Sequence, residues 1–141
     1  MPETTSKLFH KLRSRESGKA VLDQERTAPT CAQVLRELLE QIGLSVPEWI
    51  AAADISKSYA YQVLRGERIP SRDILLRTAL VLRLSLKEAQ RLLAVGGCGA
   101  LYPKIRRDAA VIFALNQHMT LLETEDLLVS LSERSLYARE S

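Results

Sequence analysis

Apolar residues recur at helical spacing along most of the chain from residue 30 onward. Leu35, Leu38, Leu39 and Ile42 follow the i, i+3, i+4, i+7 pattern of one buried helix face, and Gly43 then marks the helix end. No segment alternates apolar and polar residues with the period of two that a half-buried strand requires. The pattern therefore predicts an all-α fold, with further helices near residues 46–53, 57–65, 72–82, 86–95, 104–116 and 121–132.

Six serine and threonine residues stand where the N-caps of these helices belong, which supports the predicted boundaries. Four of them precede a Glu or Gln by three residues, the spacing of a capping box: Thr30, Ser45, Ser85 and Thr120. Ser56 and Ser71 are expected to cap the helices that follow them.

The second half of the chain contains an internal repeat. Residues 71–105 align without a gap on residues 106–140, and ten aligned positions are identical, among them the dipeptide Arg72-Asp73 with Arg107-Asp108. One helical hairpin cannot bury its own apolar face, so two such units are expected to pack as neighbours. Chance similarity between amphipathic helices is the alternative. The repeated Arg-Asp dipeptide predicts a structural role at a helix start, where the helix dipole favours Asp.

Composition is that of a folded, soluble protein, with 46% hydrophobic and 26% charged residues among 141. This length suits one domain with a short extension and excludes a large two-domain enzyme. No apolar run reaches the ~18 residues of a membrane span, and the chain opens without a signal-peptide pattern, so a cytoplasmic location is expected. Cys31 and Cys98 lack metal-site spacing and are predicted to be buried free thiols.

The net charge of +3 hides an uneven distribution. Residues 56–107 carry eleven basic and three acidic side chains, whereas residues 108–141 carry two and six. A basic central third suits a nucleic-acid partner, but basic solvated helix faces give the same count. Residues 1–29 have few apolar positions and are predicted to be a flexible tail. Its basic residues fit either an arm along a phosphate backbone or a solvated leader: Lys7, Lys11, Arg13, Arg15 and Lys19.

The stretch from Leu44 to Arg68 predicts two short helices joined by the turn Asp54-Ile55-Ser56, which has the length and capping of a helix-turn-helix. Ile55, Ala60 and Val63 are the inward positions of the second helix. Its other side then presents amide, hydroxyl, phenol and basic groups to solvent. These groups supply the donors, acceptors and cations that base edges and phosphates require.

This stretch resembles the XRE-like helix-turn-helix family, the fold of lambda repressor and Cro. The matching positions are Leu44-Ser45, Glu48, Ile55-Ser56, Lys57-Ser58, Val63, Arg65-Gly66 and Arg68. The chain is also similar to small bacterial regulators of this superfamily that carry SYxYQ-like, RxPSRD-like and LYPRxRRDA-like segments, which are residues 58–62, 68–73 and 101–109 here. The resemblance covers roughly residues 30–137 and implies a lambda repressor-like DNA-binding domain of about five helices over 30–95. Residues 96–141 are expected to form a C-terminal two-helix extension.

The resemblance also implies roles for individual residues. The base-reading residues would be Lys57, Ser58, Tyr61 and Gln62, of which Gln62 suits adenine and Lys57 suits guanine. The phosphate-binding residues would be Ser45, Ser56, Tyr59, Arg65, Arg68 and Ser71. For Tyr59, packing against Trp49 or the following loop is an equal alternative.

Three positions depart from the family pattern, which usually has Gln at Val46, a small residue at Ile50 and Gly at Asp54. Asp tolerates a left-handed backbone, so the turn is still expected to form at Asp54. The small residues Ala53 and Ala60 are expected to make room for Ile50.

Nothing in the sequence suggests an enzyme, a metal site, a cofactor or a small-molecule substrate. His10 and His118 stand alone, the cysteines have no paired His, and the segment Gly96-Gly97-Cys98-Gly99 fits a helix stop. The predicted function is sequence-specific binding of double-stranded DNA by a bacterial-type transcriptional regulator, with the helix 57–65 in the major groove.

The alternative function is a protein-interaction adaptor that uses the same fold without specific DNA binding. Apolar residues of the extension exceed what two short helices hide from each other, so most should pack on the main domain. Any remainder would serve a homodimer or a protein partner. The apolar residues of the extension are Val111, Ile112, Phe113, Leu115, Leu127, Leu128 and Leu131.

Overall fold

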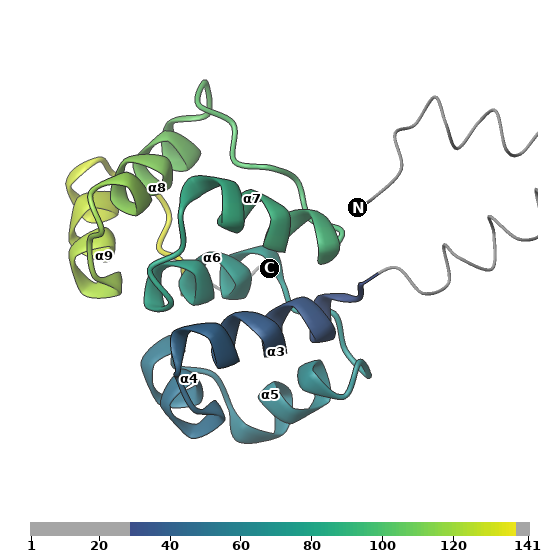
Figure 1. Ribbon diagram of the computed structural model, residues 1–141. Helices are drawn as coiled ribbons and strands as arrows, with labels where there is room; N and C mark the ends of the chain where they lie inside the picture. The colour runs from purple at the N-terminus through teal and green to yellow at the C-terminus, as the bar shows by residue number, and fades with distance from the viewer. Residues whose placement is uncertain (1–28, 138–141) are drawn as a thin grey trace, which may run out of the picture.

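The computed structural model describes residues 29–137, and this part of the chain consists of helices and their connections, with no strand (Figure 1). The all-α prediction is confirmed, and each observed helix lies within two residues of its predicted bounds. The predictions for the N-terminal tail and its basic cluster lie outside the described residues. The helices are α3 (Cys31–Ile42), α4 (Val46–Ala53), α5 (Lys57–Leu64), α6 (Arg72–Val81), α7 (Leu86–Val95), α8 (Arg106–Asn116) and α9 (Leu121–Ser130).

All six predicted N-caps are confirmed. In each, the side-chain oxygen accepts a hydrogen bond from the backbone N–H three residues later, which satisfies one of the unpaired amides of the first turn. Complete capping boxes form at Thr30, Ser45, Ser85 and Thr120. Only α8, among the described helices, begins without a side-chain cap, at Ile105.

The backbone turns sharply between α3, α4 and α5. Gly43 ends α3 with φ 78° and ψ 25°, and Asp54 ends α4 with φ 54° and ψ 57°. Both residues adopt the left-handed region, which Gly enters freely and Asp tolerates. The expectation that Asp54 replaces the usual turn glycine is therefore confirmed.

Helix α6 lies at the centre of the molecule and contacts α4, α7, α8 and α9, while α3 packs on α5 and α7 (Figure 1). Trp49 of α4 is fully buried, and its indole N–H donates to the Thr78 hydroxyl of α6 at 3.1 Å. One hydrophobic core includes Leu75 of α6 and continues to Val111 of α8 and Leu128 of α9. The C-terminal extension therefore shares the core of the preceding helices.

The hairpins α6–α7 and α8–α9 repeat each other in detail, which confirms that the 35-residue repeat is structural. Arg83 and His118, at equivalent positions, both have positive φ, 54° and 53°. The Gln90 amide accepts from the backbone N–H of Leu101 and donates to its carbonyl. Glu125, the equivalent of Gln90, accepts from the backbone N–H of Leu136. Both leucines are buried.

The repeated Arg-Asp dipeptides exchange partners between the hairpins. Arg72 of α6 donates to both carboxylate oxygens of Asp108, at 3.0 and 2.9 Å, and Arg107 of α8 donates to both of Asp73, at 3.0 and 3.1 Å. The structural role predicted at these helix starts is confirmed. Because the same operation carries each hairpin onto the other, the two units are related by an approximate two-fold axis between the starts of α6 and α8.

Each of these arginines also holds the end of its own hairpin. Arg72 donates to the carbonyls of Gly99 and Ala100, at 2.9 and 3.0 Å. Arg107 donates to the carbonyls 35 residues further on, those of Arg134 and Ser135, at 2.9 and 3.0 Å. The planar guanidinium, with donors on two edges, suits this double task.

The second arginine of α6, Arg77, joins the C-terminal segment to the turn between α4 and α5. The buried guanidinium of Arg77 donates to the carbonyls of Ala53 and Leu136, both at 2.9 Å, and to that of Asp54 at 3.4 Å. The ring of Tyr137 lies 4.4 Å from it in a cation–π contact. The end of the second hairpin and the turn before α5 are thereby held by one side chain.

Both cysteines are free thiols, as predicted, although only Cys31 is fully buried and Cys98 is half-buried. Burial raises the pKa of the Cys31 thiol, which keeps it protonated and unreactive. Within residues 29–137, no helix combines the length and apolar character that a bilayer span demands.

Candidate nucleic-acid interface

Helix α5 has one buried side and one open side. Ala60, Val63 and Leu64 are buried and Ile55 is half-buried against the core, which confirms the inward positions expected from the sequence. The Ser56 hydroxyl caps the helix by accepting from the backbone N–H of Tyr59 at 3.1 Å. The helix is thus fixed on the core by apolar contacts, and its polar side chains are left toward solvent.

The four expected base-reading residues share this open side. Lys57 and Ser58 are exposed, whereas Tyr61 and Gln62 are half-buried. The Gln62 amide nitrogen donates to the Ser58 hydroxyl at 3.4 Å, and its amide oxygen accepts from Arg68 Nε at 3.0 Å. The amide keeps one further N–H and one lone pair, which is what a bidentate contact to adenine uses.

Tyr59 contacts the loop that follows α5 and also packs against the hydrophobic core. Its hydroxyl oxygen accepts from the backbone N–H of Ser71 at 3.1 Å, and the Arg68 guanidinium lies 5.1 Å from the ring centre. The hydroxyl proton is left to donate, so the loop contact and a phosphate contact are compatible. Of the two alternatives considered for Tyr59, the structure shows the loop packing.

Arg65, Arg68 and Ser71 lie at the end of α5 and in the loop leading to α6, and all three are exposed. Arg65 forms a bidentate ion pair with Glu67, at 3.0 and 3.1 Å. The hydrogen bond from Arg65 lowers the pKa of the Glu67 carboxyl. Glu67 is therefore ionised at neutral pH, and its negative charge sits among cations that would face phosphates.

The serine residues proposed for phosphate contact are all N-caps. Ser45, Ser56 and Ser71 each accept a backbone N–H, which leaves the hydroxyl proton to donate. At Ser45 the capping box also brings in Glu48, whose pKa is lowered by hydrogen bonds from Ser45. That negative charge makes Ser45 the least favourable of the three for an anion.

Two residues that were not predicted from the sequence to act at this site also contact its residues. Arg36 of α3 donates to the Leu64 carbonyl through Nε and Nη2, at 2.9 and 2.6 Å, and so fixes the end of α5. Glu67 neutralises Arg65. Its position two residues after Arg65 is visible in the sequence, but only the bent backbone at Gly66, with φ 75°, brings the two charges together.

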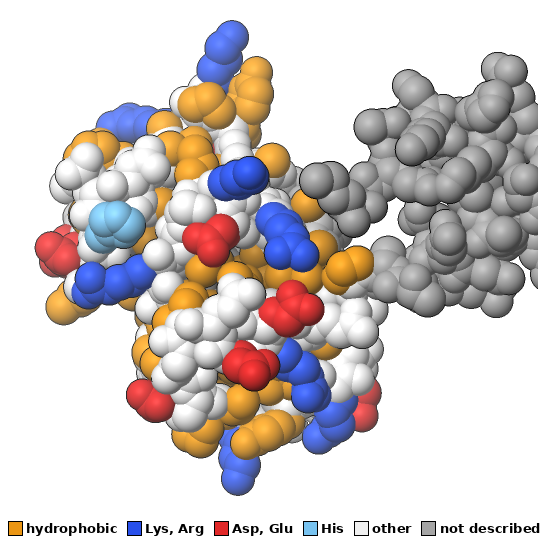
Figure 2. Space-filling view, in the orientation of Figure 1, with side chains coloured by type: hydrophobic (Ala, Val, Ile, Leu, Met, Phe, Trp, Pro, Cys, Tyr) orange, Lys and Arg blue, Asp and Glu red, His pale blue; other side chains and the backbone are white. Residues whose placement is uncertain are grey.

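The face of the molecule drawn in Figure 2 carries side chains of every type. On this side of the molecule, where α3 and α7 lie, acidic, basic and apolar side chains are interspersed without a patch of one sign. In the part of the chain that the structure describes, no three His, Cys, Asp or Glu side chains gather as a metal site. The groups that converge around α5 are hydrogen-bonding and cationic groups suited to binding a polyanion.

The pairing of Arg65 with Glu67 leads to a prediction. Glu67→Gln removes one negative charge and releases Arg65, so we expect affinity for duplex DNA to rise about two- to tenfold at low salt, in keeping with the small energy of an exposed ion pair. Fluorescence anisotropy on a labelled duplex measures this. Glu40→Gln, which changes an exposed carboxylate on α3, is the matched control, and equal affinities for the two variants would contradict the prediction.

Comparison with known proteins finds no matching family model, and neither the curated proteins nor the solved structures provide a match to the chain.

Proposed function

We propose that this chain is a sequence-specific DNA-binding transcriptional regulator whose helices α4 and α5 act as a helix-turn-helix of the lambda repressor type. In this proposal α5 enters the major groove, and the loop from Arg65 to Ser71 lies along the phosphate backbone. The chain would act in the cytoplasm of a bacterium, as the resemblance to XRE-like regulators implies.

The observation that carries the proposal is the division of α5 into two sides. Ala60, Val63 and Leu64 hold the helix on the core, while Lys57, Ser58, Tyr61 and Gln62 share the open side. A helix anchored in this way presents a rigid set of donors and acceptors, and a rigid set is what base-edge recognition in a groove requires.

The proposal predicts that two of these side chains carry sequence preference. The double variant Lys57→Ala/Gln62→Ala is expected to bind a duplex selected with the wild-type protein at least about 30-fold more weakly, since each good side-chain pair to a base is worth about 1–3 kcal/mol. On a random duplex the loss should be only the few-fold expected from one missing cation. Fluorescence anisotropy across a salt series measures both.

Lys87→Ala/Gln41→Ala is the matched control, because it removes the same two side-chain types from exposed positions on α7 and α3. It should bind both duplexes as the wild type does. The proposal is overturned if wild type binds the selected and random duplexes equally, or if the Lys57/Gln62 variant keeps the preference of the wild type.

A second candidate function is a protein-interaction adaptor, and exposed apolar side chains on the second hairpin favour it. Phe113 of α8 is 52% exposed, and Leu122 and Val129 of α9 are 72% and 73% exposed. Other apolar residues of these helices, such as Val111 and Leu115, are buried in the core. The exposed side chains are available to a second copy of the chain or to another protein. If the chain acts only as an adaptor, its affinity for DNA should not depend on Lys57 and Gln62.

A further inference from the structure

Within the part of the chain that the structure describes, three basic side chains at the ends of the second hairpin make no ion pair shorter than 3.8 Å. Lys104, Arg106 and Arg134 are all exposed. Arg106 Nε lies 4.0 Å from a carboxylate oxygen of Glu133, and Arg134 Nη2 lies 3.8 Å from one of Asp73. Both contacts are too long and too exposed to account for the residues. We refer to these three residues as the α8 patch.

The internal repeat shows that the fold does not need these charges. Arg134 corresponds to Gly99 in the first hairpin, and the backbone carbonyl of each accepts a hydrogen bond from an arginine. Since Gly99 performs that role with no side chain, the guanidinium of Arg134 is an addition. Lys104 and Arg106 likewise stand where the first hairpin has Ile69 and Ser71.

The position of the α8 patch relative to α5 follows from the paired helix starts. Arg107 and Asp73 join the start of α8 to the start of α6, and α6 begins directly after Ser71, the last residue of the proposed phosphate-binding loop. The approximate two-fold axis makes Arg106 the equivalent of Ser71. The two loops that lead into α6 and α8 are therefore equivalent, and both carry cations.

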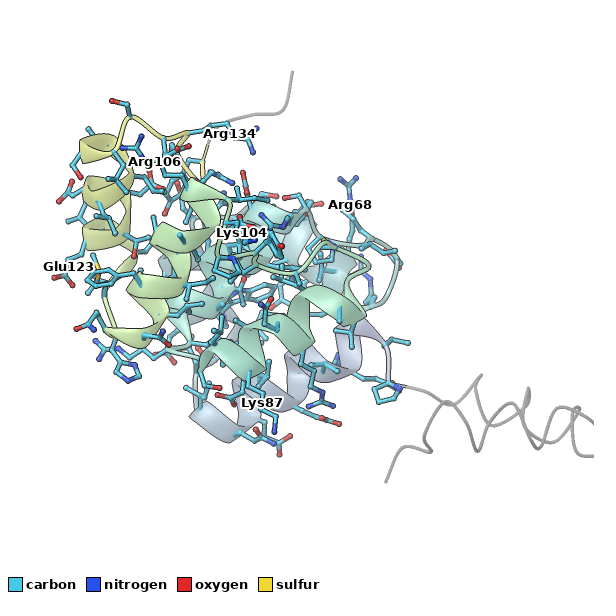
Figure 3. All side chains as sticks on the ribbon, turned by 90° about the horizontal axis from the view of Figure 1, so that it is seen from above. Arg68, Lys87, Lys104, Arg106, Glu123 and Arg134 are labelled. Atoms are coloured by element: carbon cyan, nitrogen blue, oxygen red, sulfur yellow. The ribbon has the colours of Figure 1, made fainter. Side chains whose placement is uncertain are left out.

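Figure 3 shows how the labelled cations are arranged when the molecule is seen from above. Arg68, Arg106 and Arg134 lie toward one side of the view, whereas Lys87 of α7 lies toward the opposite side. Two of the three patch residues, Arg106 and Arg134, thus lie toward the same side of the view as Arg68, and Lys104 lies nearer its middle. In the proposed complex, the phosphates that flank the base pairs read by α5 would lie on the side of the molecule that carries Arg68.

We propose that the α8 patch is a second phosphate-binding surface, which contacts the backbone of the same duplex beyond the base pairs read by α5. This inference rests on the proposed function. The backbone under the patch is held in place, because buried Arg107 fixes the Arg134 carbonyl and Asp108 accepts from the backbone N–H of Tyr102 at 3.0 Å. Long cationic side chains on a fixed backbone suit phosphate contacts, which position a protein without reading sequence.

The test compares the salt dependence of binding to two duplexes that share the selected site, one of about one helical turn and one of about three turns. The patch variant is Lys104→Gln/Arg106→Gln/Arg134→Gln in the full chain. On the long duplex its slope of log affinity against log salt should be shallower than that of wild type by about 2–3, since each phosphate contact contributes about 0.9. On the short duplex the two slopes should agree.

The matched control is Arg83→Gln/Lys87→Gln/Arg91→Gln, which removes three exposed cations from the first hairpin and gives the same net charge. Thermal unfolding midpoints of the two triple variants establish that both are folded. Equal slopes for the patch variant and the control on the long duplex overturn the second surface.

The Lys57→Ala/Gln62→Ala variant separates this inference from the proposed function. If that variant loses sequence preference while the patch variant has the same salt slope as its control, base reading by α5 is supported and the second phosphate-binding surface is refuted. If the patch variant lowers the slope while the Lys57→Ala/Gln62→Ala variant keeps the sequence preference of the wild type, the α8 patch is supported as a phosphate-binding surface and groove reading by α5 is refuted. Absence of wild-type affinity for either duplex refutes both.

Discussion

Arg107→Met is expected to lower the free energy of unfolding by about 3–5 kcal/mol, the usual cost of removing one partner from a buried ion pair. The variant leaves the buried carboxylate of Asp73 with no hydrogen-bonded cation, because Arg134 is 3.8 Å away. It also deprives the carbonyls of Arg134 and Ser135 of their donor. Most of the cost is thus the desolvation of groups left without a partner.

Urea unfolding followed by circular dichroism measures this loss. Arg106→Met is the control at the neighbouring position, where the side chain is 67% exposed, and it should cost less than about 0.5 kcal/mol. The double variant Asp73→Leu/Arg107→Met should recover part of the loss, since replacing both charges by apolar residues leaves no buried carboxylate. A similar cost for Arg107→Met and Arg106→Met would show that the buried pair contributes nothing.

Arg77→Met is expected to lower the free energy of unfolding by about 3 kcal/mol, because it strips the donor from three carbonyl groups and each unsatisfied buried group costs about 1–3 kcal/mol. The acceptors belong to Ala53, Asp54 and Leu136. Among residues 29–137 no carboxylate forms an ion pair with Arg77, so the effect tests hydrogen bonding to the backbone.

The Arg77 variant also tests whether the C-terminal segment supports the turn before α5. Hydrogen exchange of the α5 amides should accelerate in Arg77→Met relative to the α3 amides, because the turn loses its link to α6 and Leu136. Arg91→Met, at an exposed position on α7, is the control and should change neither quantity. Protection of α5 that falls no more than that of α3 would refute a local role for Arg77.

The helices could be predicted from the sequence because the signals that set them are local. Ser56 caps α5 through a residue three positions away, and Asp54 adopts its left-handed conformation within a single turn. The apolar spacing in α3 likewise needs only one helix to be considered. Because these interactions join residues that are close in the sequence, the helix boundaries could be predicted from the sequence alone.

Long-range contacts of side chains were not predictable in the same way. The repeat indicated that Arg72 and Asp73 have a structural role, but their partners lie 36 and 34 residues away and become evident only when α6 and α8 are side by side. At the candidate site, the open side of α5 was predicted by periodicity. The engagement of Tyr59 with Ser71 depends on the path of a loop, which periodicity does not describe.

The partner exchange between the two hairpins has the geometry of an isologous dimer interface, in which each contact occurs twice with the roles reversed. Here both halves belong to one chain, so their association does not depend on protein concentration, and the short connection between α7 and α8 gives each half a high effective concentration of the other. Such an arrangement is what duplication and fusion of a self-associating hairpin produces. Within one chain the two halves need not have the same sequence, and Gly99 and Arg134 make the same carbonyl contact with different side chains.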